Sequence, residues 1–358
     1  MEGNIPEADT HDSGPLRIVS IGGGTGLSTL LRGLKRYVRR DPMAYEHPEL
    51  PAIEVAAIVT VTDDGGSSGR LRRDFDVLPP GDIRNCMVAL SEDEALLSRL
   101  FQYRFSNGRG LKGHSFGNLF LTALNHLTGD FAEAVKLSSE VLASKGHIYP
   151  STAANVTLEA RLESGRTVRG ESRISRTRGR IESVRLRPRR CRPLPETLAA
   201  IAQADLITLG PGSLFTSVVP NLLVEGIPEA IRNSPALKAY FVNLMWQPGE
   251  TTGFNASDHV KAIYKHAKIP LIDYAVVNTG RIRPALIRKY ELEQAQPVVN
   301  DTHKLEAMGI RVIGADLLGE NGLVRHDPEA TARIAVELAA EGRRRKLHRA
   351  AGIRAKVS

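Results

Sequence analysis

The chain has 358 residues, two cysteines and a formal net charge of +8 at pH 7. This length can bury a large core, and two cysteines exclude a disulfide framework. No apolar run is long enough to cross a bilayer, and residues 1–15 are polar, without the apolar segment of a signal peptide. We therefore expect a cytoplasmic protein without membrane insertion, in which residues 1–15 form a disordered lead-in.

The first predicted element is a buried strand, Leu16–Ile21, followed by a glycine-rich loop and a helix over Thr29–Lys35. Glycine lets a bound group lie against the backbone, and a helix start offers free N–H groups and the positive end of its dipole. The loop matches neither standard nucleotide template, because Leu27 replaces a small residue and no lysine appears before Lys35. The pattern leaves two interpretations open, a phosphate site and a plain tight turn. The candidate phosphate-binding residues are Gly22, Gly23, Gly24, Thr25 and Gly26.

Two adjacent carboxylates, Asp63 and Asp64, follow the second predicted strand, Glu54–Val61. They are the metal candidates, because carboxylates can hold Mg²⁺ while phosphate oxygens complete its ligand shell. Either carboxylate could instead accept a ribose hydroxyl, and an Asx turn is the simplest alternative. Ser67 and Ser68, in the Gly65–Gly69 run, are further ligand candidates.

Arg84 falls in the first turn of a predicted helix that starts at Asp82, where a cation opposes the helix dipole. An anionic ligand would offset that cost, and so would an ion pair with Asp82 or Glu92. His114 could donate to a phosphate or act as an acid or base, and Asn118 could bind a base or sugar. Both could equally be local hydrogen-bond partners. The helices predicted in this part of the chain are Asp82–Leu90, Glu94–Phe101, Ser115–Leu127 and Phe131–Ala143.

Residues 153–192 alternate like strands and predict an inserted, arginine-rich β-meander. Twelve arginines and four glutamates between Glu159 and Arg192 give this segment a charge of +8. Clustered arginines can contact phosphate backbones, but residues 151–192 contain no Phe, Tyr or Trp on which bases could stack. We therefore favour a solvated sheet face or a protein-contact surface over nucleic-acid binding. The predicted strands are Val156–Leu162, Thr167–Ile174 and Ile181–Arg187.

A second glycine loop, Gly210–Ser217, follows the predicted strand Asp205–Leu209 and opens a helix, so it is a second candidate anion site. The alternative is simple capping of that helix by Ser213. Asn243, on the predicted strand Ala239–Met245, could read a sugar or base edge. The ligand candidates here are Gly210, Gly212, Ser213 and Asn243. The remaining predicted elements are a helix over Ser257–His266, a strand over Tyr274–Asn278, and an amphipathic helix over Pro328–Arg345 that leads into a basic tail, 341–358, of charge +6.

The alternation of strands and helices predicts an α/β fold with a Rossmann-like, doubly wound, largely parallel sheet. We expect one domain over residues 16–340, interrupted by the arginine-rich insertion. Ligands of such sheets bind beyond the carboxyl ends of the strands, so the polar motifs that follow the strands should meet in one crevice. The sequence contains neither zinc-site spacing nor the serine elbow of hydrolases.

Six motifs, in this order, resemble the YvcK-type gluconeogenesis factors, a family similar to the CofD-like 2-phospho-L-lactate transferases of deazaflavin cofactor synthesis. The resemblance extends over nearly the whole chain, from Arg17 to Glu341. The motifs are Ile21–Ser28, Thr62–Arg72, Leu78–Asn85, His114–Leu119, Gly210–Ser217 and Asn243–Thr252.

This resemblance implies a cytoplasmic bacterial protein that acts in carbon metabolism and cell shape during growth on gluconeogenic carbon sources, through effects on envelope synthesis. It implies binding of a UDP-sugar such as UDP-N-acetylglucosamine at the Gly22–Ser28 loop. The transferase relatives imply instead a group transfer with Mg²⁺ held at Asp63 or Asp64. The extended Gly-Gly-Ser-Ser-Gly run after these aspartates favours the gluconeogenesis-factor branch.

Three hypotheses follow from the sequence. The first is a nucleotide-sugar-binding regulator without turnover, which can form a homodimer or bind protein partners. The second is a Mg²⁺-dependent transferase that acts on a phosphorylated substrate. The third, which the lack of aromatic residues in the insertion disfavours, is a nucleic-acid-binding protein.

Overall fold

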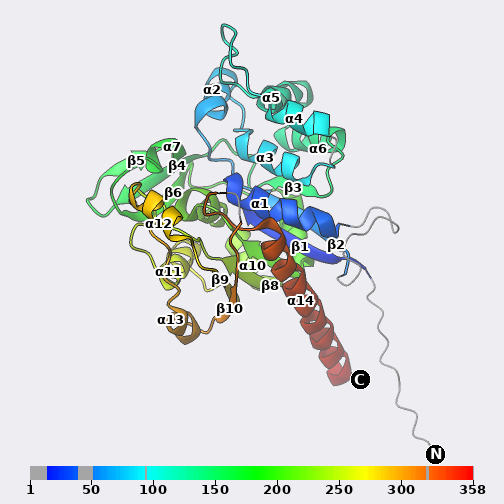
Figure 1. The fold of residues 1–358 in the computed structure, drawn as a ribbon. Coiled ribbons are helices and arrows are strands. Elements are labelled where there is room, and N and C mark those ends of the chain that lie inside the picture. The colour runs from blue at the N-terminus through cyan, green and yellow to red at the C-terminus, as the bar shows by residue number, and fades with distance from the viewer. Residues whose placement is uncertain (1–13, 39–50, 93–94, 320–321, 358) are drawn as a thin grey trace, which may run out of the picture.

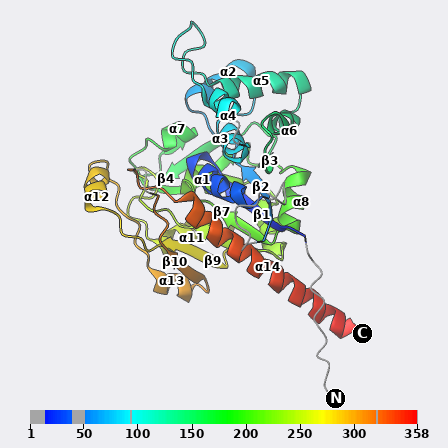
Figure 2. The same ribbon diagram turned by 45° about the vertical axis from the view of Figure 1, so that its right-hand side comes forward.

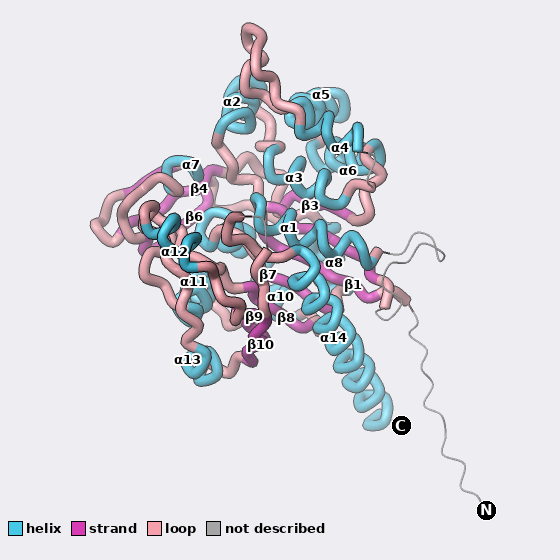
Figure 3. The backbone as a smooth tube through the Cα atoms, viewed as in Figure 1, coloured by secondary structure: helices cyan, strands magenta, loops and turns pink. Residues whose placement is uncertain are grey.

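The computed structural model describes residues 14–38, 51–92, 95–319 and 322–357. Most of the predicted lead-in, residues 1–13, lies outside the described residues, as does Glu94, the predicted first residue of a helix. A central sheet is surrounded by helices, with a smaller sheet to one side (Figures 1 and 3).

Every strand pairing in the central sheet is parallel, and the strand order is β10-β9-β8-β7-β1-β2-β3. The chain therefore winds outward from β1 in one direction and from β7 in the other, as in a Rossmann fold. The order reverses between β1 and β7, and this switch point is where ligands bind in such folds. The fold class predicted from the sequence is confirmed. The strands are β1 (Leu16–Gly22), β2 (Ile53–Val59), β3 (His147–Pro150), β7 (Leu206–Leu209), β8 (Leu237–Phe241), β9 (Tyr274–Asn278) and β10 (Arg311–Ala315).

Helices cover both faces of the sheet (Figures 1 and 2), which explains why its central strands are apolar on both sides. The 30-residue C-terminal helix packs on the first helix. The helices are α1 (Gly24–Leu34), α2 (Gly66–Phe75), α3 (Gly81–Leu90), α4 (Ala95–Gln102), α5 (Phe116–Thr128), α6 (Phe131–Val141), α7 (Glu171–Ile174), α8 (Pro195–Gln203), α9 (Val219–Leu222), α10 (Ile227–Asn233), α11 (Ala256–Ala267), α12 (Pro284–Glu291), α13 (Thr302–Ala307) and α14 (Pro328–Val357), with a 3₁₀ turn over Lys35–Tyr37 and a π-helical segment over Leu214–Val218.

Two predicted boundaries shift at the carboxyl edge of the sheet. The first helix begins at Gly24 rather than Thr29, so the glycine loop itself forms the first helical turn. Strand β8 ends at Phe241 rather than Met245, which leaves Asn243 in a loop. Both shifts bring more backbone to the switch point than the sequence pattern indicated.

The arginine-rich insertion is an antiparallel sheet, as predicted, but its strand order is β5-β4-β6 rather than the β4-β5-β6 of a meander. Its strands are β4 (Thr157–Leu162), β5 (Thr167–Arg169) and β6 (Ile181–Arg187). The strand predicted over Thr167–Ile174 stops early because Gly170 adopts a left-handed conformation, with φ of 95°, and the short helix α7 follows. This helix carries the chain across to the free edge of β4.

Four of the insertion's arginines are paired with glutamates. Arg169, Arg185 and Arg187 surround Glu159, whose side chain is 1% exposed, and Arg161 pairs with Glu182. Burial raises the pKa of Glu159, but the arginines lower this pKa by a larger amount, so the net result is a decrease. Two glutamates thus offset half of the charge of these four arginines, and this part of the sheet is less cationic than its arginine content suggests.

The C-terminal helix extends to Val357 and includes nearly all of the predicted basic tail (Figures 1 and 2). The first basic residue of this tail, Arg343, donates to the fully buried carboxylate of Asp205 at 2.6 Å, and Lys346 lies 3.6 Å from the same group. Arg345 pairs with Glu341. The prediction of unpaired positive charge at this end is wrong for these residues, because the sheet places Asp205 beneath the helix.

Within the described ranges, no single helix combines the length and the apolar composition needed to span a membrane, although one bent pair, Leu214–Leu222 with Ile227–Asn233, passes the same test.

Candidate functional site

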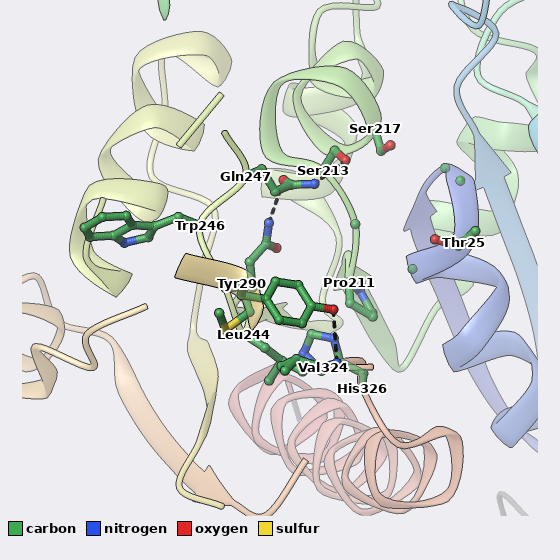
Figure 4. A pocket seen from close by; sticks show the side chains of 16 residues that line it. Thr25, Pro211, Ser213, Ser217, Leu244, Trp246, Gln247, Tyr290, Val324 and His326 are labelled. Carbon is green, nitrogen blue, oxygen red and sulfur yellow. Dashed lines mark hydrogen bonds between the residues drawn. The ribbon is translucent and has the colours of Figure 1, made fainter. Parts of the chain in front are cut away.

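A cavity of about 260 Å³ lies at the switch point, directly beyond the ends of β1, β7 and β8 (Figure 4). We call it the glycine-loop pocket. Both predicted glycine loops reach it, together with the loop that follows β8. Its lining residues are Gly23, Gly24, Thr25, Gly26, Pro211, Gly212, Ser213, Ser217, Asn243, Leu244, Met245, Trp246, Gln247, Tyr290, Val324 and His326.

The first glycine loop presents free backbone donors to the pocket. No described residue accepts a hydrogen bond from the N–H groups of Thr25 or Gly26, and the helix that they open has no side-chain cap. Gly24 adopts φ of 62°, and a Cβ on Gly26 would lie 2.6 Å from the Pro211 carbonyl oxygen. The two loops are packed so closely that only glycine fits, and the helix start remains open to an anion.

The second glycine loop already binds a carboxylate of this chain. The Phe215 N–H donates to Glu250 at 3.2 Å, and the Thr216 hydroxyl donates to Glu250 at 3.1 Å. Burial raises the pKa of Glu250 to about 7, although these two donors lower it. Gly212 and Ser213 line the pocket, whereas these inner donors are unavailable to a ligand, so the expected second anion site is reduced to its outer rim.

A short chain of amides forms the opposite wall of the pocket. Gln247 donates to the Ser213 hydroxyl at 2.6 Å and accepts from the Asn243 side-chain N–H at 3.0 Å. The Asn243 side-chain oxygen has no hydrogen-bond partner among the described residues, although Asn243 is only 8% exposed. A buried carbonyl oxygen without a donor is costly, so a ligand N–H or hydroxyl at this point would gain binding energy.

Three lining residues were not identified from the sequence. Tyr290, from α12, accepts a hydrogen bond from the Val324 N–H at 3.2 Å. His326 lies 3.2 Å from the Val242 carbonyl oxygen, and burial lowers its pKa to about 4, so the ring is neutral at pH 7. These residues come from segments far along the chain with no motif of their own, and only the fold brings them to the glycine loop.

Trp246 also lines the pocket. Its indole N–H donates to the Phe254 carbonyl oxygen at 2.9 Å. In Figure 4 the ring lies on the far side of the pocket from Thr25. Trp246 therefore anchors a loop at the rim, and Tyr290 is the other aromatic residue of the lining.

Five predicted ligand residues lie elsewhere, in what we call the serine–histidine cluster. The Ser67 hydroxyl lies 2.9 Å from Nδ1 of His114, and Asn118 donates to Ser68 at 3.3 Å. Burial lowers the pKa of His114, with a further contribution from Arg70, so its imidazole is neutral at pH 7. The cluster consists of Ser67, Ser68, Arg84, His114 and Asn118.

Two buried polar atoms in this cluster have no hydrogen-bond partner in the part of the chain that the structure describes. They are Nε of Arg84 and the side-chain oxygen of Asn118, a residue only 2% exposed. Arg84 donates to its neighbour Asn85 and forms no ion pair with Asp82 or Glu92, which were the simple alternatives. Burial, together with Arg104, lowers the pKa of Arg84.

The paired aspartates point to different partners. Asp63 accepts the Gly65 N–H at 2.8 Å, which is the Asx turn, and its other oxygen lies toward Gly81 beside the Ser68 hydroxyl. Asp64 accepts from the N–H and hydroxyl of Ser172, at 2.9 and 2.5 Å, and thereby ties α7 of the insertion to the central sheet. No group of three or more His, Cys, Asp or Glu residues is arranged to hold a metal in the described part of the chain.

Asp82 separates the two regions. A Cβ on Gly23 would lie 2.7 Å from the Asp82 carboxylate, so this acid sits directly against the first glycine loop. Burial, with Asp63 and Glu171 nearby, raises its pKa to about 7, against the opposing effects of the Gly24 N–H and Arg84. Asp82 thus loses its proton near neutral pH, next to the free amides of the pocket.

The predicted ligand residues therefore divide into three groups. Gly23, Gly24, Thr25, Gly26, Gly212, Ser213 and Asn243 line the glycine-loop pocket. Gly22 and Gly210 form the backbone of the turns behind it. The remaining five belong to the serine–histidine cluster.

Comparison with known proteins assigns the family. A model of the family described as 2-phospho-L-lactate transferase CofD matches residues 18–318. This chain belongs to the CofD family. The assignment that the motifs predicted is confirmed, and the matched range contains the serine–histidine cluster and all of the glycine-loop pocket except Val324 and His326.

Within the CofD family, several relatives resemble this chain over most of its length. It is 47% identical to the gluconeogenesis factor of Bacillus subtilis (strain 168) over 326 residues, which cover 91% of this chain and 98% of that protein. A gluconeogenesis factor of Halalkalibacterium halodurans is 46% identical over 321 residues, covering 89% and 95%. A crystal structure of a Bacillus halodurans protein, 45% identical, has a TM-score of 0.84 and covers 90% of this chain and 100% of that one.

Proposed function

We propose that the glycine-loop pocket binds a nucleotide-diphosphate sugar of the UDP-N-acetylglucosamine class and that this protein is a cytoplasmic regulator rather than a catalyst. The observation that carries the proposal is that free hydrogen-bond donors and a free acceptor line the same cavity. At the Rossmann switch point the N–H groups of Thr25 and Gly26 have no acceptor among the described residues and are available to an anion, and the Asn243 side-chain oxygen, which has no donor among those residues, lines the same cavity. One end of such a ligand is anionic and the other carries N–H and hydroxyl donors.

In this arrangement the diphosphate would lie against the start of α1. The lining contains neither Lys nor Arg, so its negative charge would be balanced by backbone N–H groups and the helix dipole. Asn243 would accept a hydrogen bond from the uracil or the sugar. The sequence suggested that Asp63, Asn118 and Asn243 could contact the ribose or the base, but of these residues only Asn243 lines this pocket.

The biological role that we propose follows the names of the relatives. Two of them are called gluconeogenesis factors. We infer a role during growth on gluconeogenic carbon sources, in which the bound nucleotide-sugar reports on precursors of the cell envelope and thereby affects cell shape.

Calorimetric titration with UDP-N-acetylglucosamine tests the proposal. Gly26→Val should abolish the binding heat, because its Cβ would lie 2.6 Å from the Pro211 carbonyl oxygen. Gly22→Ala is the matched control, since its Cβ meets atoms no closer than 3.5 Å. Unchanged binding by a folded Gly26→Val protein would place the ligand elsewhere.

The second candidate is a Mg²⁺-dependent transferase, which the name of the family favours. Asp63 is the better metal ligand of the two aspartates, because one of its oxygens lies beside the Ser68 hydroxyl while Asp64 is engaged by Ser172. One carboxylate and one hydroxyl suit Mg²⁺ only if substrate phosphates supply further oxygens. The cation would then stabilise charge on the phosphate.

Release of nucleotide from an activated donor in the presence of Mg²⁺ would support the transferase. Asp63→Asn should abolish that release and Asp64→Asn should preserve most of it. If the wild-type protein binds the donor without releasing nucleotide across a panel of acceptors, the regulator is favoured.

A further inference from the structure

A second cavity, of about 490 Å³, lies between the arginine-rich insertion and the loop that follows β8. It is separate from the glycine-loop pocket and shares no lining residue with it. Three arginines of one loop, Arg176, Arg178 and Arg180, line it. The remaining lining residues are Ser175, Thr177, Gly179, Pro248, Gly249, Glu250, Thr252, Leu292, Glu293 and Gln294. We call it the arginine cavity.

The charge of these three arginines is not neutralised by ion pairs. Arginines on the strands of the same insertion pair with Glu159 or Glu182, whereas none of the three forms an ion pair with a carboxylate in the described part of the chain. Three like charges around one cavity repel one another unless an anion lies between them. The arginines that pair with glutamates therefore lie on the strands of the sheet, whereas the three at the cavity have no ion-pair partner among the described residues.

Two glutamates also line the cavity, and they do not cancel this charge. The Glu250 carboxylate is already engaged by the Phe215 N–H, by the Thr216 hydroxyl and, at 3.5 Å, by the hydroxyl of Ser175, which also lines the cavity. Glu293 lies at the opposite rim, on the exposed segment after α12. The net charge of the lining stays positive.

The arginine loop is held in place before any ligand arrives. Thr177, 9% exposed, donates through its hydroxyl to the Arg173 carbonyl oxygen at 3.0 Å and through its N–H to Ile174 at 2.9 Å. Its own carbonyl oxygen lies so close to Gly249 that no side chain fits there. With Thr177 fixed, Arg176 and Arg178 emerge on either side of it, and little conformational entropy is lost on binding.

We propose that the arginine cavity is a second anion-binding site, which takes a small molecule bearing two or more phosphate groups. Guanidinium groups bind phosphate oxygens through paired, charge-assisted hydrogen bonds. The site is concave and contains no aromatic residue, so it suits a compact polyanion rather than stacked bases. The 247–252 loop forms one wall of each cavity, because Gln247 lines the glycine-loop pocket and Gly249 lines this one.

Titration of the full chain with inorganic pyrophosphate, at constant ionic strength, tests this site. We expect the triple variant Arg176→Gln, Arg178→Gln, Arg180→Gln to lose one pyrophosphate site or to bind it at least about tenfold more weakly. The double variant Arg189→Gln, Arg190→Gln is the matched control, because both arginines are exposed on the same insertion and outside the cavity. It should bind like the wild type.

A local readout separates this site from the glycine-loop pocket. Trypsin cleavage after Arg176, Arg178 and Arg180, followed by mass spectrometry, should slow when pyrophosphate is present, because these three sites lie in the arginine cavity and not in the glycine-loop pocket. Cleavage after Arg189 reports any general inhibition of the protease. Equal pyrophosphate binding by the triple variant and the wild type would overturn the proposal. So would protection of the loop by a mixed-sequence oligonucleotide but not by pyrophosphate, which would make it a nucleic-acid contact.

Discussion

The glycine-loop pocket and the serine–histidine cluster each contain a buried asparagine whose side-chain oxygen has no partner. Asn243 lies in a loop at the sheet edge, whereas Asn118 is in the first turn of α5, behind Ser68. The pocket around Asn243 is an open cavity with free backbone donors, and Asn118 is enclosed by its own helix and α2. The same orphaned atom therefore indicates a ligand contact in one region and favours a structural role in the other.

Electrostatics separate the two regions further. Asp82 and Asp63 stand between them, and their mutual repulsion is part of the reason for the raised pKa of Asp82. An anion at the start of α1 would avoid these carboxylates. A cation would be drawn to them, which is why the metal-dependent alternative concerns Asp63 and not the glycine loop.

Substitution of Asn243 should have the largest effect among the tests of this difference between the two regions. Asn243→Ala should weaken binding of UDP-N-acetylglucosamine about ten- to a hundredfold, because the ligand loses an acceptor in a buried site. Isothermal calorimetry measures the change. Asn125→Ala, on α5 and without a side-chain hydrogen bond among the described residues, is the control. A loss of less than threefold would show that the Asn243 oxygen does not face the ligand.

Asn118→Ala should lower the stability of the protein and leave its ligand affinity nearly unchanged. It removes the bond to Ser68 and leaves a small void, so the free energy of unfolding should fall by about 1–3 kcal/mol. Urea denaturation measures this, and affinity for the nucleotide-sugar should stay within about twofold of the wild type. A strong loss of affinity without loss of stability would extend the binding site into the serine–histidine cluster.

Asp82 should make ligand binding depend on pH. With a pKa of about 7 this carboxyl ionises between pH 6 and 8, and the resulting charge repels a diphosphate on the adjacent loop. Affinity should therefore fall about three- to tenfold over this range. Asp82→Asn should flatten the profile at the high-affinity level, as titrations at several pH values would reveal.

The same pKa shift has a consequence for folding. Because the folded state raises the pKa of Asp82 above its model-compound value of 3.8, the stability due to its protonated form is lost as the pH rises toward 7. Asp82→Asn should thus unfold at a higher urea concentration than the wild type at pH 8. A lower midpoint would mean that the ionised Asp82 carboxylate is itself stabilising.

Trp246→Phe should have the smallest effect. The variant keeps an aromatic ring but loses the hydrogen bond to the Phe254 carbonyl oxygen, which should cost about 1 kcal/mol of stability. Ligand affinity should barely change, because the ring lies at the rim. A clear loss of affinity, measured by calorimetry, would indicate that the Trp246 ring stacks on the ligand.

Much of the pocket was predictable because it consists of backbone. The strand–glycine–helix pattern located the start of α1, and Gly212, Ser213 and Asn243 were found through the same reasoning about strand ends. Tyr290 and His326 were not, because no local pattern indicates which distant loop will cover a cavity. The division between pocket and cluster was also missed, since both follow strands of the same sheet.

The amino-acid sequence alone indicated five of the seven strands of the central sheet, the position of the glycine turns and the family, because these depend on short-range periodicity and backbone geometry, whereas β3 and β10 were not predicted. Tertiary structure alone decided which charges are neutralised. Glu159 gathers three arginines, Asp205 meets Arg343, and Glu250 fills the second glycine loop. The energy of a charge depends on the groups within a few ångströms of it, and those neighbours come from parts of the chain that only folding brings together.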